Sequence, residues 1–243
     1  MDLRQIKNNL AEIIRMPKVA INLDLAASAG NHPFFRQAVL DFYRLSQKRH
    51  PKFPLFRANR FGVAVCWLPP DFEKYFMQIE AAARRNHKKA ERLGYECTRI
   101  DYNRFLADIA AIRSSAEVRQ GPMPEEYLRG QVERVDNPPS QNKKQDYPFF
   151  GVLRGGRLFA YAGCLITGEV CFLEHIFGHA DYQKDGVVPF LIIEIARALY
   201  GQYPGVKYYV YGGWFGAQRT MQRFKRKFNF LPHRVEWILG EEK

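Results

Sequence analysis

The sequence predicts an α/β or α+β fold, in which a mostly antiparallel sheet is flanked by helices. Three observations support this class. Runs rich in β-branched and aromatic residues recur through the chain, amphipathic patterns separate them, and the nearly all-apolar run DGVVPFLIIEIARALYG at 185–201 indicates a buried helix. With 47% hydrophobic and 14% aromatic residues, the 243-residue chain has enough apolar material for a packed core and room for one or two domains.

The first part of the chain reads mainly as helices. Apolar residues at helical spacing predict a helix over 3–14, which Pro17 ends, and an amphipathic helix over 33–47. RFGVAVCWL at 60–68 has the composition of a strand. A long helix is then expected over 70–93, ending at Gly94, with a run of cations in its second half.

From residue 95 the order of elements changes. A strand at 95–100 is followed by predicted helices at 102–115 and 123–135 and by an exposed polar, proline-bearing loop at 135–146. Three strands follow, joined by turns at 154–156 and 167–169. The buried helix at 185–201, a strand at 206–213, a helix at 215–228 and a last strand at 233–239 complete the chain.

The charge and the cysteines restrict the class of protein. A formal net charge of +12 favours polyanionic partners such as RNA, a nucleotide-sugar, a phosphorylated cofactor or an anionic membrane surface, although the excess can also serve solubility alone. The four cysteines are isolated, which is typical of reduced, buried thiols in a cytoplasmic protein. The first residues lack an apolar signal core, and no run approaches the ~20 apolar residues of a membrane span. We therefore expect a cytoplasmic protein without a membrane span, and its oligomeric state stays open.

The order of elements from residue 95 resembles that of the GNAT acyltransferases. In that family a Q/R-x-x-G-x-G/A loop precedes a long helix and holds the pyrophosphate of CoA. The matching loop here consists of Gln183, Lys184, Asp185, Gly186, Val187 and Val188. The resemblance implies acetyl-CoA or another acyl-CoA as donor, and a backbone amide near Ile176, Phe177 and Gly178 for the reacting carbonyl. Val188 is larger than the pattern asks, Asp185 would repel phosphate and Pro189 has no N–H, so an ordinary turn before a buried helix is the alternative.

A finer resemblance is to the Fem-type (FemAB-like) aminoacyl and peptidyl transferases, which have GNAT-like domains. It covers roughly residues 60–240 and is carried by RRNHKKAERLGYECTRI at 84–100, IRSSAEVRQGPM at 112–123 and YYVYGGWFGAQRTMQRFKRKFNFLPHRV at 208–235. The resemblance implies an amine-bearing acceptor, such as a nucleotide-sugar or a cell-envelope precursor. No tRNA-binding coiled-coil insertion is evident, so tRNA is not the favoured donor. It also implies a GNAT-like domain at 95–243, after a helical extension or degenerate GNAT-like half at 1–94.

Several polar residues are candidates for the chemistry of acyl transfer, which needs a base, a polarised carbonyl and an acid for the leaving group. Glu174 is the first candidate for the base and His175 the second, and strand alternation predicts that they point to opposite faces. Tyr211 is a candidate acid. The alternatives are a buried or solvated role for the first two and a core role for the tyrosine. His175 and His179 would lie about 13 Å apart along a strand, so we expect no metal site.

The segment MQRFKRKFNFLP at 221–232 separates into three parts on a helical wheel. Met221, Phe224 and Phe228 form an apolar face, and Arg219, Arg223 and Arg226 lie opposite. Lys225 falls at the border of the apolar face. In the Fem-type transferases the matching Phe–Lys pair belongs to the active site, which implies that Phe224 contacts substrate and that Lys225 stabilises the reacting carbonyl.

A second polar cluster follows the predicted helix at 102–115. Arg119 and Gln120 are candidates for binding a carboxylate or phosphate of the acceptor, with a helix-capping role as the alternative. Taken together, these features predict an N-acyltransferase. A non-catalytic RNA- or nucleotide-binding protein on the same scaffold is the second hypothesis, since the net charge and the basic helices fit it as well.

Overall fold

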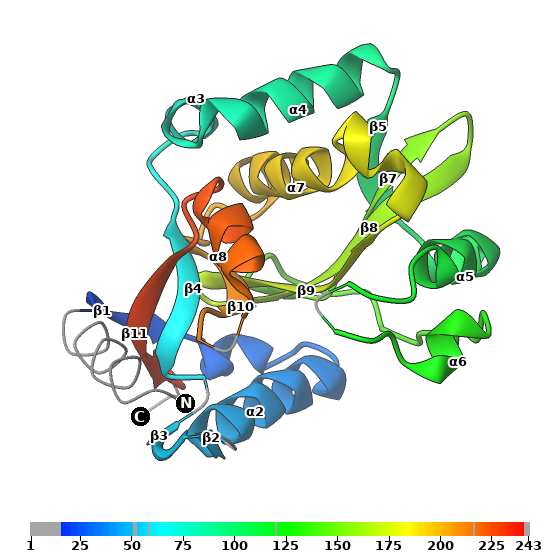
Figure 1. Ribbon diagram of the computed structural model, residues 1–243. Coiled ribbons are helices and arrows are strands. Elements are labelled where there is room, and N and C mark those ends of the chain that lie inside the picture. Colours follow the sequence, from blue (N-terminus) through cyan, green and yellow to red (C-terminus); the bar gives the residue numbers. More distant parts are fainter. Residues whose placement is uncertain (1–15, 51–52, 58, 120, 216, 241–243) are drawn as a thin grey trace.

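The computed structural model describes residues 16–50, 53–57, 59–119, 121–215 and 217–240, and it is built around one mixed sheet (Figure 1). The 9-stranded sheet has the order β1-β11-β4-β10-β9-β8-β7-β5, and β6 pairs with β8 outside this path. The strands are β1 (Lys18–Asn22), β4 (Phe61–Trp67), β5 (Glu96–Ile100), β6 (Gln145–Asp146), β7 (Phe149–Arg154), β8 (Arg157–Thr167), β9 (Val170–Gly178), β10 (Tyr208–Gly213) and β11 (Leu231–Ile238). A separate hairpin joins β2 (Arg49–His50) to β3 (Phe53–Arg57).

Most strand pairs are antiparallel, as predicted, and the two parallel pairs are β1 with β11 and β9 with β10. The helices are α2 (Pro33–Gln47), α3 (Phe72–Gln78), α4 (Ala81–Arg92), α5 (Leu106–Ser114), α6 (Glu125–Leu128), α7 (Val187–Gln202) and α8 (Arg219–Arg226). Short 3-10 turns lie at Leu25–Ser28, Tyr102–Phe105 and Ala180–Asp185. The predicted helix at 3–14 lies outside the described residues.

Helices cover both faces of the sheet. One face packs α3, α4, α7 and α8 into the largest core cluster, with α7 between α4 and the strands (Figure 1). This position explains why α7 is apolar on nearly all sides, because a helix sandwiched between two layers has little exposed surface. The other face packs α2 against β1, β4, β10 and β11, and α5 against β7, β8 and β5.

The long helix predicted over 70–93 is broken, and that prediction was wrong. The chain turns out of helical geometry at Ile79 and Glu80, with ψ values of 155 and 143. Arg84 donates hydrogen bonds to the carbonyl oxygens of Met77 and Ile79 at 2.5 and 3.1 Å, which satisfies the open C-terminus of α3. The amide of Glu80 donates to the carbonyl of Lys227 at 2.9 Å, so a tertiary contact replaces a helical one.

The helix predicted over 123–135 was also wrong beyond its first turn. The helix α6 ends at Leu128, and Gly130 follows in the left-handed region with φ 73. The chain then runs without regular secondary structure from 131 to 140, and the side chain of Asn103 anchors it. The side-chain amide of Asn103 donates to the carbonyl of Val135 at 2.7 Å, and its oxygen accepts from the amide of Val135 at 2.9 Å.

The first strand was not predicted. Val19 and Ile21 of β1 are buried, and the strand pairs in parallel with β11. The predicted boundary at residue 94 falls between α4 and β5, and strands from both sides of it belong to the same sheet.

The sheet opens at its centre, where β9 and β10 separate. Their parallel pairing runs from Tyr208 opposite Val170 to Val210 opposite Phe172. Beyond these residues, the described parts of the two strands are not paired with each other. Since β9 continues to Gly178 and β10 to Gly213, the two strands leave a gap between their carboxyl ends. This gap positions the candidate site described next.

Candidate active site

Two hollows lie along α2, on the sheet face that this helix covers. The larger has a volume of about 580 Å³ and the smaller about 160 Å³. The first turns of α2 line the larger hollow through Phe34 and Ala38, and its later turns line the smaller one through Phe42 and Leu45. The smaller hollow lies where β9 and β10 separate, because Glu174 of β9 and Gly213 of β10 both line it.

A hydrogen-bonded pair connects the two hollows. Tyr147 lines the larger one, Glu174 lines the smaller one, and the Tyr147 hydroxyl donates to Glu174 Oε2 at 2.5 Å. Burial and the neighbouring carboxylate raise the pKa of Tyr147, so its hydroxyl keeps its proton and can only donate to Glu174 near neutral pH. Glu174 is a predicted site residue. Sequence reasoning missed Tyr147, which offers no local signal because its partner is 27 positions away.

A β-bulge brings both predicted base candidates to one face. On β8, Tyr161 pairs with Phe177 and Gly163 with Glu174, so Ala162 faces two residues of β9. His175 occupies the bulge with φ 48, an unusual backbone angle for a residue other than glycine. The prediction that Glu174 and His175 point to opposite faces was wrong, since both line hollows along α2. The extra residue interrupts the alternation of side chains.

Lys225 lies at the gap between β9 and β10, from the other side of the sheet. Its side chain is 5% exposed, and Nζ donates to the carbonyl oxygen of Gly213 at 2.6 Å. Nζ also lies 4.9 Å from the ring centroid of Tyr211. Burial lowers the pKa of Lys225 to about 8, so the ammonium still predominates at physiological pH and is lost as pH rises above about 8. Burial raises the pKa of Tyr211, whose ring also packs against Phe230.

The three-part division predicted for α8 is confirmed. Arg219, Arg223 and Arg226 are exposed, while Phe228 is fully buried. Phe224 packs on Phe228 with ring centroids 5.1 Å apart, and Lys225 is the buried cation. Phe224 therefore contributes to the core around Lys225 and lines neither of the two hollows.

The predicted phosphate loop lies under α4. Gly186 has φ 84, and a Cβ added to it would lie 2.7 Å from the carbonyl oxygen of Asn86. Lys89 of α4 donates to the carbonyl of Lys184 at 2.6 Å, and the Tyr95 hydroxyl donates to Asp185 at 2.9 Å. The close packing against α4 explains why a glycine is needed at position 186, and the bond from Tyr95 gives the Asp185 carboxylate a partner within the protein.

The remaining loop residues divide between surface and core. Gln183 and the side chain of Lys184 are exposed, whereas Val187 is fully buried. A Cβ added to Gly178 would lie 2.4 Å from Cγ2 of Val188, so this glycine permits close approach of α7 to the end of β9. Ile176 packs with the α7 side of the sheet and Phe177 with the α5 side.

Arg119 fastens the segment after α5 to the end of β9. Its guanidinium donates to the carbonyl of Gly178 at 2.9 Å, to the carbonyl of Ile112 at 2.7 Å and to Ser115 Oγ at 3.1 Å. These three hydrogen bonds use most of the N–H groups of the guanidinium, so Arg119 fixes the position of the segment between α5 and β9. Gln120 lies outside the described residues.

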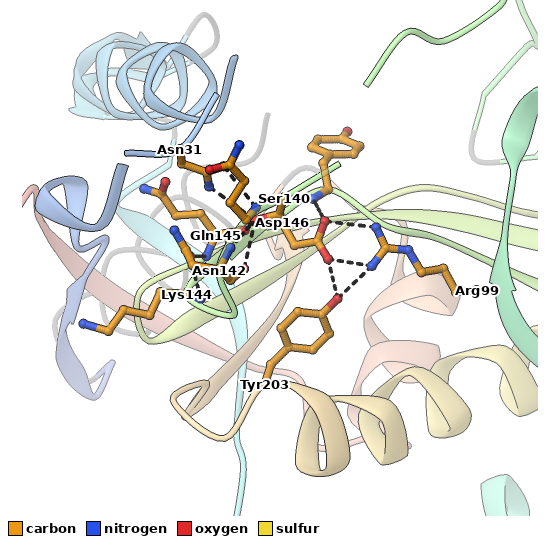
Figure 2. Close-up of polar contacts among 10 residues, drawn as sticks. Asn31, Arg99, Ser140, Asn142, Lys144, Gln145, Asp146 and Tyr203 are labelled. Atoms are coloured by element: carbon orange, nitrogen blue, oxygen red, sulfur yellow. Dashed lines mark hydrogen bonds and ion pairs between the residues drawn. The ribbon is translucent and has the colours of Figure 1, made fainter. Parts of the chain in front are cut away.

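The polar loop predicted at 135–146 forms a wall of the larger hollow, through Val135 and Asn137. Figure 2 shows how its far end is held. Ser140 accepts a hydrogen bond from Asn31 at 3.2 Å, and Asn142 donates to the carbonyl of Ala27 at 3.0 Å. These bonds tie the loop to the segment just before α2, so the two walls of the hollow are connected.

Within the described ranges, no group of three or more His, Cys, Asp or Glu side chains is arranged to hold a metal ion. No helix in the same ranges has the length and apolar character needed to cross a membrane.

Comparison with known proteins identifies the fold. No protein-family model matches the sequence, and no curated protein matches it. Among solved structures, FemX aligns over 71% of this chain and 59% of its own, with a TM-score of 0.55 and 8% identity. The C-terminal domain of a protein assigned as a lysylphosphatidylglycerol synthetase, from Agrobacterium fabrum, aligns over 71% and 57%, with a TM-score of 0.46 and 15% identity. A tandem GNAT protein from the clavulanic acid biosynthesis pathway aligns over 58% and 43%, with a TM-score of 0.38 and 14% identity.

The alignment with FemX confirms the predicted fold, a GNAT-like mixed sheet flanked by helices. The chain spans less than three fifths of the length of each of these three proteins. At 8% identity the likeness is one of fold, and the activity has to be argued from the site itself.

Proposed function

We propose that this chain, which shares its fold with FemX, is an N-acyltransferase. It would move an acyl or aminoacyl group from an activated donor, favoured as a CoA thioester, to an amine acceptor. The observation that carries the proposal is the gap between β9 and β10, with the Glu174 carboxylate on one strand and the Lys225–Gly213 contact at the other. A gap of this kind lets a donor on one face of the sheet meet an acceptor on the other.

In this proposal Lys225 stabilises the negative charge that develops on the reacting carbonyl. A buried ammonium is effective in this role because little water competes with it. Its bond to the Gly213 carbonyl fixes the direction of Nζ before substrate arrives. The bulge at His175 exposes backbone amides that strand pairing would otherwise occupy, and these could add a second donor to the same oxygen.

Glu174 is the proposed base for the attacking amine. An ammonium cannot attack a carbonyl until it has lost a proton, and a carboxylate at the edge of the smaller hollow can accept it. Tyr147 orients this carboxylate through its hydrogen bond. His175 lines the larger hollow, and in this proposal it contacts the acceptor rather than sharing the role of Glu174.

The donor would approach from the face that carries α7. The exposed side chains of Gln183 and Lys184 next to the start of α7 are the proposed contacts for its phosphates. A CoA thioester would place the reaction in the cytoplasm.

The proposal is tested by measuring thiol release from acetyl-CoA by the full chain with a panel of primary amines. We expect release that depends on the amine and is lost in Lys225→Met and Glu174→Gln. Calorimetry provides a second measurement, in which acetyl-CoA should bind in the absence of an amine. No binding of acetyl-CoA, and no amine-dependent release with any thioester in a set of chain lengths, would reject the CoA-dependent reaction.

A second candidate function follows from the cations of α4 and α8. Arg85, Lys88 and Arg92 of α4 are exposed, and Arg219, Arg223 and Arg226 of α8 are exposed on the same side of the sheet. Such a surface suits a polyanion such as RNA. Binding of RNA with a steep salt dependence, together with no binding of acetyl-CoA, would favour this second function.

A further inference from the structure

The larger hollow contains a buried cation that has no carboxylate partner among the described residues. Arg113 of α5 is 8% exposed and lines the hollow. Its Nε donates to the hydroxyl of Tyr161 at 2.8 Å, and its Nη2 donates to the hydroxyl of Tyr102 at 3.0 Å. The guanidinium carbon lies 4.2 Å from the ring centroid of Tyr127. All these partners are neutral, so the charge itself is not compensated by protein.

An uncompensated buried charge is costly, and buried cations are normally paired. Even the half-exposed Arg99 and Arg197 pair with carboxylates, those of Asp146 and Glu194. In the described part of the chain, Nη1 of Arg113 has no hydrogen-bond partner. Because the residue lines the hollow, this donor is available to a ligand.

The rest of the hollow restricts what that ligand is. Its walls carry aromatic rings, from Phe34, Tyr102, Tyr127, Tyr147 and Phe149. Two carboxylates, Glu126 and Glu133, line it as well, but both side chains are exposed to solvent and so are screened from Arg113. Arg134, which is also exposed, lines the hollow as well and offsets one of these charges, so the lining suits a ligand that carries both an anionic group and an amine.

We propose that the larger hollow binds the acceptor through a single carboxylate or phosphate group held by Arg113, with a ring or apolar body against the aromatic walls. The assignment of this ligand as the acceptor rests on the proposed acyl transfer. The amine would then lie toward Tyr147 and Glu174, the pair that connects the larger hollow to the smaller one. The acceptor class is therefore an amine that carries one oxyanion on a compact, ring-bearing body.

The experiment measures binding of simple probes to the full chain without any acyl donor. Calorimetry and thermal unfolding are recorded with benzoate, with phenyl phosphate and, as a neutral control, with benzamide. We expect at least one anion to bind and to raise Tm in a concentration-dependent way, and the stronger of the two identifies the group. Arg113→Gln should weaken the binding of that anion at least tenfold, while Arg157→Gln, at an exposed arginine at the start of β8, should leave that binding unchanged.

A second variant covers the case in which Arg113→Gln does not fold. Ala38→Phe brings a ring into the hollow from α2 and leaves Arg113 in place, so it should also weaken the binding of the anion at least tenfold. Undiminished anion binding in either folded variant would overturn the proposal, and so would benzamide binding as strongly as the anions. Anion binding that depends on Arg113, in a protein that acylates no amine, would keep this site and reject the proposed acyl transfer.

Discussion

The side-chain nitrogen of Lys225 lies 2.6 Å from the carbonyl oxygen of Gly213, at the end of the strand that separates from β9. The lysine comes from α8 and is buried, whereas the glycine is exposed and lines the smaller hollow. The hydrogen bond therefore connects a buried cation to a solvent-accessible gap in the sheet. This connection makes Lys225 the residue on which the proposed chemistry depends most directly.

Replacing Lys225 by methionine tests that role. Methionine keeps an unbranched side chain of similar length, so the core around α8 should stay packed and the variant should fold. We expect kcat to fall by roughly 10²-fold or more, as when one donor to a developing oxyanion is removed. The matched control is Arg226→Met, at an exposed cation on the same helix, and it should keep full activity. Full activity in Lys225→Met would leave the lysine with a packing role only.

The same lysine should give the protein a distinctive pH dependence. Burial lowers the pKa of Lys225 from 10.5 to about 8, so between these values the unfolded chain holds a proton that the folded chain has released. The stability of the wild type relative to Lys225→Met should then rise as pH increases from about 8 to 10.5. Activity should do the opposite and fall above about pH 8, because the ammonium is the active form. Parallel denaturant titrations and rate profiles measure both, and two curves that rise together would contradict the assignment.

Local patterns in the sequence were enough to predict most of the fold. The helix α7 and the meander of β7, β8 and β9 are each specified by residues close together in the chain. The buried position of Lys225 could be predicted for the same reason, because a helical wheel needs only the spacing within α8. The order of these elements along the chain then indicated the GNAT-like class.

Tertiary contacts decided the features that were missed. The break at Ile79 depends on Arg84 and on the distant Lys227, and no local pattern announces either contact. The bulge at His175 depends on how β8 pairs with β9. Arg113 and Tyr147 have the pattern of ordinary helix and strand residues, and only the packing of α2 and α5 on the sheet places both of them at the larger hollow.

Removing the hydroxyl of Tyr147 tests how much the orientation of Glu174 matters. Tyr147→Phe loses the 2.5 Å hydrogen bond and leaves the carboxylate free to turn. We expect kcat to fall about tenfold with little change in KM, and stability to fall by about 1 kcal/mol. Tyr200→Phe is the matched control, since it loses a hydroxyl bonded to the carbonyl of Pro69 at 2.8 Å, outside both hollows. An equal loss of activity in both variants would assign the effect to stability rather than to Glu174.

The loop before α7 allows a test of the donor site in which binding and folding are separated. Lys184→Glu reverses an exposed charge and should weaken the binding of acetyl-CoA by several-fold without changing Tm. Gly186→Ala should lower Tm and leave the affinity for acetyl-CoA unchanged. The reason is that φ 84 is strained for alanine, and its Cβ would lie 2.7 Å from the Asn86 carbonyl oxygen. We expect that variant to lose about 2 kcal/mol of stability. Unchanged acetyl-CoA affinity in Lys184→Glu would place the donor phosphates elsewhere.

The buried Asp146 should control the wall of the larger hollow from a distance. Arg99 donates to both of its carboxylate oxygens, at 2.7 and 3.2 Å, and the Tyr203 hydroxyl donates at 2.6 Å (Figure 2). Asp146→Asn removes the negative charge, so two charge-assisted bonds from Arg99 are weakened. The Arg99 side chain is 48% exposed, which limits the expected loss to about 2 kcal/mol by urea unfolding.

The effect on function should follow from the position of Asp146 at the end of the polar loop at 135–146, which forms a wall of the larger hollow. If β6 loosens from β8, Val135 and Asn137 lose their fixed place beside the hollow, so KM for the acceptor should rise while kcat changes little. Tyr203→Phe should give the same pattern with a smaller loss, about 1 kcal/mol. The loss of stability in the double variant should be smaller than the sum of the losses in the two single variants, because both changes act on one carboxylate. A strictly additive result, or a fall in kcat with KM unchanged, would show that this network does not act through the wall of the hollow.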